Sequence, residues 1–214
     1  MNNKTIIYYT SNIEDEKFEN KIVQGIMDVK GDIPVISVSQ KPMNFGENIC
    51  VGDVGYSYVN AFRQLRIGCE KAKTPFVIMA ESDCLYPKSG YFDFVPTDPN
   101  VIYNFNNVWI FFKRKPQLFY RKYQTHGSII YGREYLMDFI DNILKDCPIW
   151  TREKIGFPWY GPEQKFVEFG GEVPIINVIT GANNRRGTHL LKQEPVGHLP
   201  YWGTGEEVKK KYEI

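Results

Sequence analysis

Two carboxylates, Glu81 and Asp83, follow a continuous apolar run at residues 76–80. A run of this length and composition is typical of a buried central strand. Carboxylates two residues apart at the end of such a strand can turn their oxygens toward one divalent cation, and Mg²⁺ typically takes one or two protein carboxylates plus substrate phosphates. A turn-capping role is the alternative, because short acidic motifs often arise without a ligand. The pattern therefore predicts a metal site at this strand end.

Polar residues also follow two earlier predicted strands, at residues 4–9 and 33–38. The polar residues after these two strands are Thr10, Ser11, Asn12, Ser39 and Gln40. In open α/β sheets, ligands bind at the carboxyl ends of the strands. We therefore expect these groups and the two carboxylates to line a single ligand site.

The remaining periodicity indicates alternating helices and strands. Apolar residues at helical spacing predict helices over residues 14–31, 56–73 and 133–144, and a short helix over 163–169. Apolar runs predict one or two strands within 101–112 and further strands at 128–131 and 173–179. The sequence shows neither a linker nor an internal repeat, so we predict one α/β domain spanning residues 1–214, with a mostly parallel central sheet flanked by helices.

Composition narrows the possible environments and partners. The 26 Lys and Arg against 25 Asp and Glu give a net charge of +1, so any nucleic acid must be held by a local patch. The first residues lack a signal peptide, and no run approaches the roughly 20 apolar residues of a membrane span. We expect a cytoplasmic protein, in the host cytoplasm if it is viral. The four cysteines lack metal-ligand spacing and are predicted to be free thiols.

Residues 65–87, LRIGCEKAKTPFVIMAESDCLYP, resemble the helix, buried strand and acidic motif of glycosyltransferases with the GT-A fold. That resemblance implies a Rossmann-like domain with a nucleotide-binding half, 1–90, and an acceptor-binding half, 91–214. It further implies Mn²⁺ or Mg²⁺ at Asp83, with Glu81 near the ribose or a metal-bound water. The donor would be a nucleoside-diphosphate sugar, most simply a UDP-sugar. Thr10, Ser11 and Asn12 would contact its base and ribose.

The same resemblance suggests roles for residues further along the chain. Residues 159–164 are similar to the segment that supplies the general base of many inverting members, which implies Glu163 as the catalytic base. A third metal ligand would come from His189 or His198. Phosphate contacts are expected from four arginines. These are Arg63 and Arg66 in the second predicted helix, and Arg185 and Arg186 in a polar loop at 181–187 that could act as a lid.

We therefore predict a metal-dependent, inverting glycosyltransferase that moves a sugar to a hydroxyl acceptor, either a glycan, a small molecule or a modified DNA base. Small GT-A-like enzymes of bacteriophages include some that glycosylate modified DNA bases. A DNA acceptor would use basic clusters at 113–115, 121–122 and 209–211, with aromatics interleaved along 111–123. The alternatives are a nucleotidyltransferase, for which a Gly-rich phosphate loop is missing after the first strand, and a non-enzymatic nucleic-acid-binding module.

Overall fold

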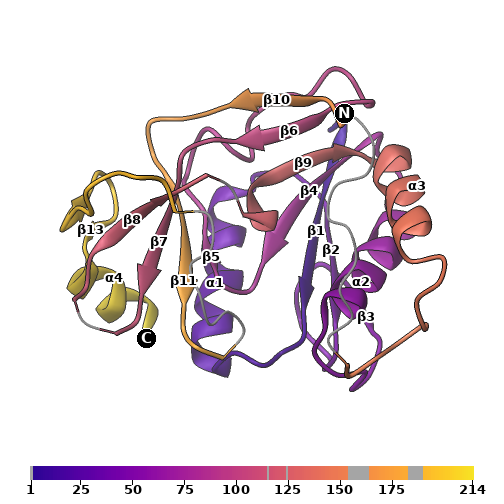
Figure 1. Cartoon of the computed structure of the whole chain (residues 1–214), viewed down its shortest axis with the longest axis horizontal. Coiled ribbons are helices and arrows are strands. Elements are labelled where there is room, and N and C mark those ends of the chain that lie inside the picture. Colours follow the sequence, from indigo (N-terminus) through magenta and orange to yellow (C-terminus); the bar gives the residue numbers. More distant parts are fainter. Residues whose placement is uncertain (1, 115, 124, 154–163, 183–189) are drawn as a thin grey trace.

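The computed structural model describes residues 2–114, 116–123, 125–153, 164–182 and 190–214. Its largest element is a seven-stranded sheet in the order β10-β6-β9-β4-β1-β2-β3 (Figure 1). β4 pairs in parallel with β1, β1 with β2, β2 with β3, and β10 with β6, whereas β9 runs antiparallel to both β4 and β6. The strands are β1 (Lys4–Thr10), β2 (Val35–Ser39), β3 (Glu47–Cys50), β4 (Phe76–Glu81), β6 (Ile102–Phe105), β9 (Ile129–Gly132) and β10 (Phe166–Phe169).

Helices cover both faces of this sheet. α2 (Tyr58–Lys71) and α3 (Arg133–Ile143) pack on one face, and α1 (Glu16–Val29) lies on the other (Figure 1). The alternation of buried side chains along β1 separates the two cores: Ile7 packs with the α2 and α3 residues, and Ile6 with the α1 residues. The predicted mixed α/β architecture with a mostly parallel, helix-flanked sheet is confirmed.

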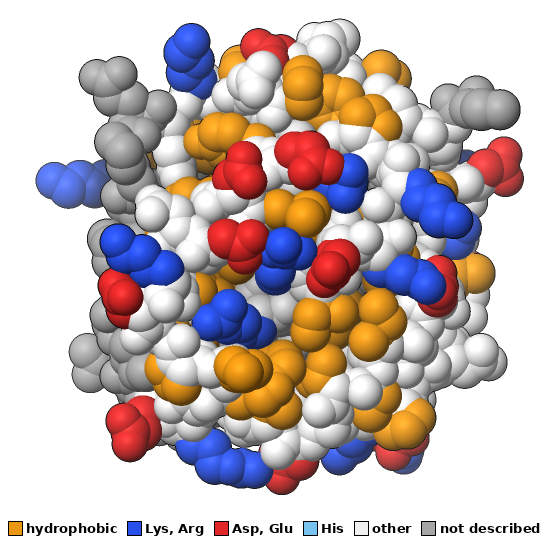
Figure 2. Space-filling view, turned by 90° about the vertical axis from the view of Figure 1, so that its right-hand side faces the viewer, with side chains coloured by type: hydrophobic (Ala, Val, Ile, Leu, Met, Phe, Trp, Pro, Cys, Tyr) orange, Lys and Arg blue, Asp and Glu red, His pale blue; other side chains and the backbone are white. Residues whose placement is uncertain are grey.

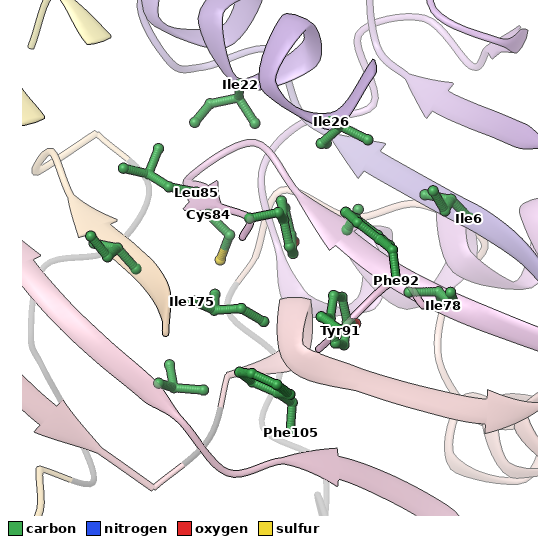
Figure 3. Close-up of a cluster of buried hydrophobic side chains, with 14 of the residues drawn as sticks. Ile6, Ile22, Ile26, Ile78, Cys84, Leu85, Tyr91, Phe92, Phe105 and Ile175 are labelled. Carbon is green, nitrogen blue, oxygen red and sulfur yellow. The ribbon is translucent and has the colours of Figure 1, made fainter. Parts of the chain in front are cut away.

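A second sheet extends the α1 side of the molecule. Its order is β5-β11-β7-β8, formed by β5 (Cys84–Leu85), β11 (Ile175–Ile179), β7 (Val108–Phe112) and β8 (Phe119–Lys122). Figure 3 shows Leu85 and Cys84 between Ile22 of α1 and Ile175 of β11, with Phe105 on the far side of the same cluster. A short hairpin of β12 (His198–Leu199) and β13 (Gly203–Thr204) leads into α4 (Gly205–Tyr212).

The three long predicted helices are present, with ends shifted by a few residues. The short helix expected at 163–169 is wrong: Phe166–Phe169 form β10, which pairs with β6 at the edge of the central sheet. Its burial pattern has one buried residue, Phe169, and side-chain periodicity in so short a segment does not distinguish the two structures. β3, β8 and α4 were not anticipated. All four cysteines are free thiols.

Within the described part of the chain, every helix is too short or too polar to cross a bilayer.

Candidate active site

The carboxyl ends of β1, β2 and β4 meet along one edge of the central sheet. Thr10 is in register with Ser39, and Tyr9 with Glu81, so the predicted polar strand ends do converge. Asn12, in the loop after β1, is hydrogen-bonded to the loop after β2. Its backbone has a positive φ of 50°, a conformation that Asn tolerates, and its Oδ1 accepts hydrogen bonds from the backbone N–H groups of Gln40 and Lys41.

Glu81 is held from both sides of the sheet edge. Its Oε1 accepts a hydrogen bond from the Tyr9 hydroxyl at 2.5 Å, and its Oε2 accepts one from the backbone N–H of Gly127 at 2.8 Å. Gly127 belongs to a 3-10 turn, η1 (His126–Ser128), that precedes β9. Because β9 is antiparallel to β4, its start lies beside the end of β4. The carboxylate of Glu81 is therefore fixed rather than free to rotate.

Asp83 lies deeper than Glu81 and is 7% exposed. Burial and the nearby charges of Glu81 and Glu14 raise the pKa of its carboxyl to about 7, while Lys122 and a hydrogen bond from Asn177 act in the opposite direction. Its backbone oxygen accepts a hydrogen bond from Val178 N–H in β11. Asp83 thus connects the acidic strand end to the second sheet.

Glu14 is a third carboxylate at this place, and sequence analysis assigned it instead to the first turn of a helix. α1 begins at Glu16, with Asp15 as its N-cap, so Glu14 falls in the preceding loop. It is 7% exposed, and its Oε1 accepts a hydrogen bond from the Thr180 hydroxyl, just after β11. Its position four residues after the end of β1, the strand next to β4, was the signal that sequence analysis could have used.

The donor set at this edge fits a hard divalent cation. Ligand atoms of Glu81, Asp83 and Cys84 lie within 4.8 Å of one another. Burial and the adjacent carboxylates raise the pKa of the Cys84 thiol well above its usual range, so Cys84 stays protonated and donates toward Asp83 Oδ1 at 3.5 Å. Carboxylate oxygens, the preferred ligands of Mg²⁺ and suitable ones for Mn²⁺, remain as the ligands.

Aromatic groups border the carboxylates. Tyr56, 48% exposed, precedes α2, and its pKa is raised to about 12 by partial burial and by the charges of Tyr58, Asp83, Glu81 and Glu14. The turn that carries Tyr56 is anchored because the Gly55 carbonyl accepts hydrogen bonds from Gln40 and Asn60. The phenol of Tyr56 is thus held protonated beside the acids, as a hydrogen-bond donor.

The structure gives Arg63 and Arg66 other partners than a phosphate at this edge. Arg63 donates to the carbonyls of Leu144 and Cys147, and Arg66 to both carboxylate oxygens of Asp141 in α3. Helical spacing places both arginines toward α3, where their guanidinium groups tie α2 to its neighbour. The prediction that they neutralise phosphate stays a prediction; in this structure both guanidinium groups have the partners named above.

His198, a predicted metal ligand, lies exposed in β12 of the small hairpin. It does not belong to the group of described ligand atoms around Glu81 and Asp83. Four further predicted site residues fall outside the described residues: Glu163, Arg185, Arg186 and His189.

Only some of the residues predicted to form a basic and aromatic surface along 111–123 are exposed. Phe111 and Phe119 are completely buried, so they cannot stack on bases. Arg121 lies over the Trp109 ring and donates to Asn107, and Lys122 is buried beside the acidic cluster. Lys113 and Arg114 are exposed. A hollow of about 360 Å³ lies near this region, lined by residues including Gln117 and Glu206, and contains none of the cluster carboxylates.

No protein-family model matches the chain, and no characterised protein is detectably similar to it in sequence. Solved structures to which this chain is similar include S. aureus TarS 1–349 in complex with UDP-GlcNAc (TM-score 0.44, 12% identity, 88% of this chain and 60% of that one). A second structure of S. aureus TarS 1–349 has a TM-score of 0.38 at 10% identity, covering 68% of this chain and 49% of that one. The bifunctional IspDF of Campylobacter jejuni has a TM-score of 0.37 at 10% identity, covering 69% and 46%.

The chain thus spans between 46% and 60% of the length of these structures. At TM-scores below 0.5, the likeness carries no argument about activity.

Proposed function

We propose that this protein is a metal-dependent glycosyltransferase that uses a nucleoside-diphosphate sugar. One observation carries the proposal: Glu81 ends the buried strand β4 and Asp83 follows two residues later, with their ligand atoms within 4.8 Å, at the edge where β1 and β2 also end. Ligands of open α/β sheets bind at that edge. Two hard carboxylates at this point suit a divalent cation shared with substrate phosphates.

Glu81 and Asp83 would hold Mg²⁺ or Mn²⁺, with Glu14 as a further carboxylate beside them. The cation would neutralise charge on the leaving nucleoside diphosphate. Tyr9 and Gly127 fix the Glu81 carboxylate in one orientation, which avoids reorganisation when the donor binds. Thr10, Ser11 and Asn12 begin the loop that would contact the nucleoside.

Glu163 is proposed as the general base that takes the proton of the acceptor hydroxyl, with inversion at the anomeric carbon. This role rests on the sequence resemblance. Glu163→Gln should slow the chemical step by roughly 10²- to 10⁴-fold, the usual contribution of general acid–base catalysis. UDP binding, measured by calorimetry, should be retained. Loss of UDP binding in this variant would contradict the base assignment.

A thermal-shift screen with and without Mn²⁺ tests the central proposal. UDP and UDP-GlcNAc should raise the unfolding temperature only when Mn²⁺ is present, and uridine should not. Ligand at 100 times its dissociation constant stabilises a protein by about 2.7 kcal/mol. Asp83→Asn is the matched control and should show no metal-dependent shift. A flat response to every nucleotide would reject the transferase.

Product analysis separates the proposal from the nucleotidyltransferase alternative. A glycosyltransferase releases UDP from a UDP-sugar, by transfer or by slow hydrolysis. A nucleotidyltransferase instead releases pyrophosphate from a nucleoside triphosphate and leaves UDP-sugars intact. Chromatography of incubations with UDP-sugars and with triphosphates distinguishes the two reactions.

The acceptor is proposed to be a hydroxyl compound, with a modified DNA base as the specific candidate from sequence. The exposed Lys113 and Arg114 and the lysines of α4 would then contact DNA. Duplex binding at two salt concentrations tests this, because each neutralised phosphate contributes a slope of about −0.9 in log K against log salt. If duplex DNA does not bind at low salt, the DNA acceptor is rejected, and a glycan or a small molecule remains as the proposed acceptor.

A further inference from the structure

A buried lysine lies next to the acidic cluster. Lys122, the last residue of β8, is 7% exposed, and its Nζ donates a hydrogen bond to Asn177 Oδ1 at 3.0 Å. Lysine is almost never buried to this degree unless it is paired, because removing the ammonium from water is costly. A partner for the Lys122 ammonium is therefore expected at this place.

Among the described residues, the Lys122 ammonium has that single hydrogen-bond partner and no carboxylate oxygen within 4 Å. An ammonium carries three N–H donors, so two are not used by the described residues. Nevertheless, its charge acts on Asp83, on the Cys84 thiol and on His126. The ammonium is therefore near the carboxylates without being in direct contact with them.

Asn177 explains the separation. It is 1% exposed, its Oδ1 accepts from Lys122, and its amide hydrogen-bonds Asp83. It is the polar residue in the otherwise apolar β11, and it links the cation to the acid while keeping them apart. The result is a positive group and a cluster of carboxylates at the same site, with two donors of the positive group that no described residue uses.

We propose that Lys122 binds the phosphate groups of the donor, beside the cation held by Glu81 and Asp83. This rests on the proposed function for the identity of the donor. A phosphate oxygen is the group that both a divalent cation and an ammonium bind well. Lys122 then supplies the positive charge that sequence analysis sought in Arg63 and Arg66. The alternative is that Lys122 only offsets the charge of the carboxylates.

The test measures binding of Mn²⁺ alone and of inorganic pyrophosphate at saturating Mn²⁺, by calorimetry on the full chain. Lys122→Met should weaken pyrophosphate binding roughly 10- to 100-fold, or about 1.4–2.7 kcal/mol, in the range of a hydrogen bond to a charged group. Affinity for Mn²⁺ alone should be equal or higher, because a neighbouring positive charge is removed. Lys145→Met, at an exposed lysine after α3, is the matched control and should change neither affinity.

If Lys122→Met does not fold, Lys122→Gln carries the test, because its amide can still donate to Asn177 while the charge is lost. Unchanged pyrophosphate affinity in the folded variant would overturn the proposal and make Lys122 a counter-charge alone. Failure of the wild type to bind pyrophosphate with Mn²⁺ would overturn it as well. If pyrophosphate binding depends on Lys122 but no UDP-sugar is cleaved, the phosphate site stands and the transferase proposal fails.

Discussion

Charged side chains gather in two regions of this molecule, and they are arranged in opposite ways. On the α2–α3 face, Arg66 Nε lies 2.9 Å from one oxygen of Asp141, and another nitrogen of Arg66 lies 3.7 Å from Glu70. Figure 2 views this side of the molecule and shows basic and acidic groups interspersed across it. These charges neutralise one another at the surface, where each pair contributes little free energy.

At the carboxyl edge of the central sheet, like charges are gathered instead. The charges of Glu81 and Glu14 act on Asp83 in a buried environment and raise its pKa to about 7. Such an arrangement costs folding free energy, because burial and repulsion both disfavour the ionised form. Because the gathered carboxylates destabilise the fold, we infer that they serve to bind a ligand. The charge pairs between α2 and α3 instead join two helices.

The largest effect is expected from Asp83→Asn, which keeps the side-chain volume and removes one of the gathered charges. Turnover of a UDP-sugar should fall at least about 100-fold, since metal stabilisation of transition-state charge supplies several kcal/mol. Binding of Mn²⁺, followed by calorimetry or electron paramagnetic resonance, should weaken in parallel. Full activity in this variant would place the metal site elsewhere.

The pH dependence of stability should also differ between the wild type and Asp83→Asn in the absence of divalent cations. The pKa of Asp83 is raised in the folded state, so the folded state binds more protons than the unfolded state between about pH 4 and 7. The contribution of Asp83 to stability is complete below that window and is lost as pH rises through it.

Urea unfolding at several pH values with a chelator present measures this difference. The free energy of unfolding of the wild type, relative to Asp83→Asn, should decrease by a few kcal/mol from pH 4 to pH 7.5. Added Mn²⁺ should restore stability to the wild type at pH 7.5 and not to the variant. Parallel pH profiles of the two proteins would mean that Asp83 titrates normally.

The acidic strand end could be predicted from sequence because its signal is local. A buried apolar run followed by Glu81 and Asp83 needs no knowledge of the rest of the chain, and the polar ends of β1 and β2 follow the same rule. The central βαβ arrangement is predictable for the same reason, since periodicity identifies each element and parallel pairing follows from the connection.

The partners of the carboxylates could not be predicted, because they come from distant segments. Gly127 reaches Glu81 only because β9 pairs antiparallel to β4, and Asn177 reaches Asp83 only because β11 pairs with β5. Neither strand pairing can be recognised from the local amino-acid composition. The arginines of α2 illustrate the same limit, since a basic residue in a sequence carries no information about which neighbour will bind it.

Gly127→Ala tests whether the Glu81 carboxylate depends on its close neighbours. A Cβ at this position would lie 2.8 Å from the Tyr86 hydroxyl and 3.0 Å from both Cys84 Sγ and Glu81 Oε2. We expect a loss of about 1–3 kcal/mol in stability, the usual cost of overpacking, together with weaker Mn²⁺ binding. Chemical denaturation and metal titration measure the two effects.

Gly25→Ala is the matched control, because a Cβ in that part of α1 comes no closer than 3.8 Å to the Tyr212 hydroxyl. Replacing a glycine inside a helix should be neutral or stabilise by up to about 1 kcal/mol. If Gly127→Ala binds Mn²⁺ as tightly as Gly25→Ala, then the geometry around Glu81 is not needed for the metal.

The smallest effect is expected from Arg66→Ala, which removes the cation of the surface cluster. Its partners are exposed, with Asp141 at 51% and Glu70 at 73% side-chain exposure, so the loss in unfolding free energy should be below about 1 kcal/mol. UDP affinity in the presence of Mn²⁺ should be unchanged, because the guanidinium is bound to Asp141 in α3. A tenfold loss of UDP affinity would mean that Arg66 leaves Asp141 to contact the nucleotide. The α2–α3 charges would then also take part in ligand binding, and the two regions would not differ in this respect.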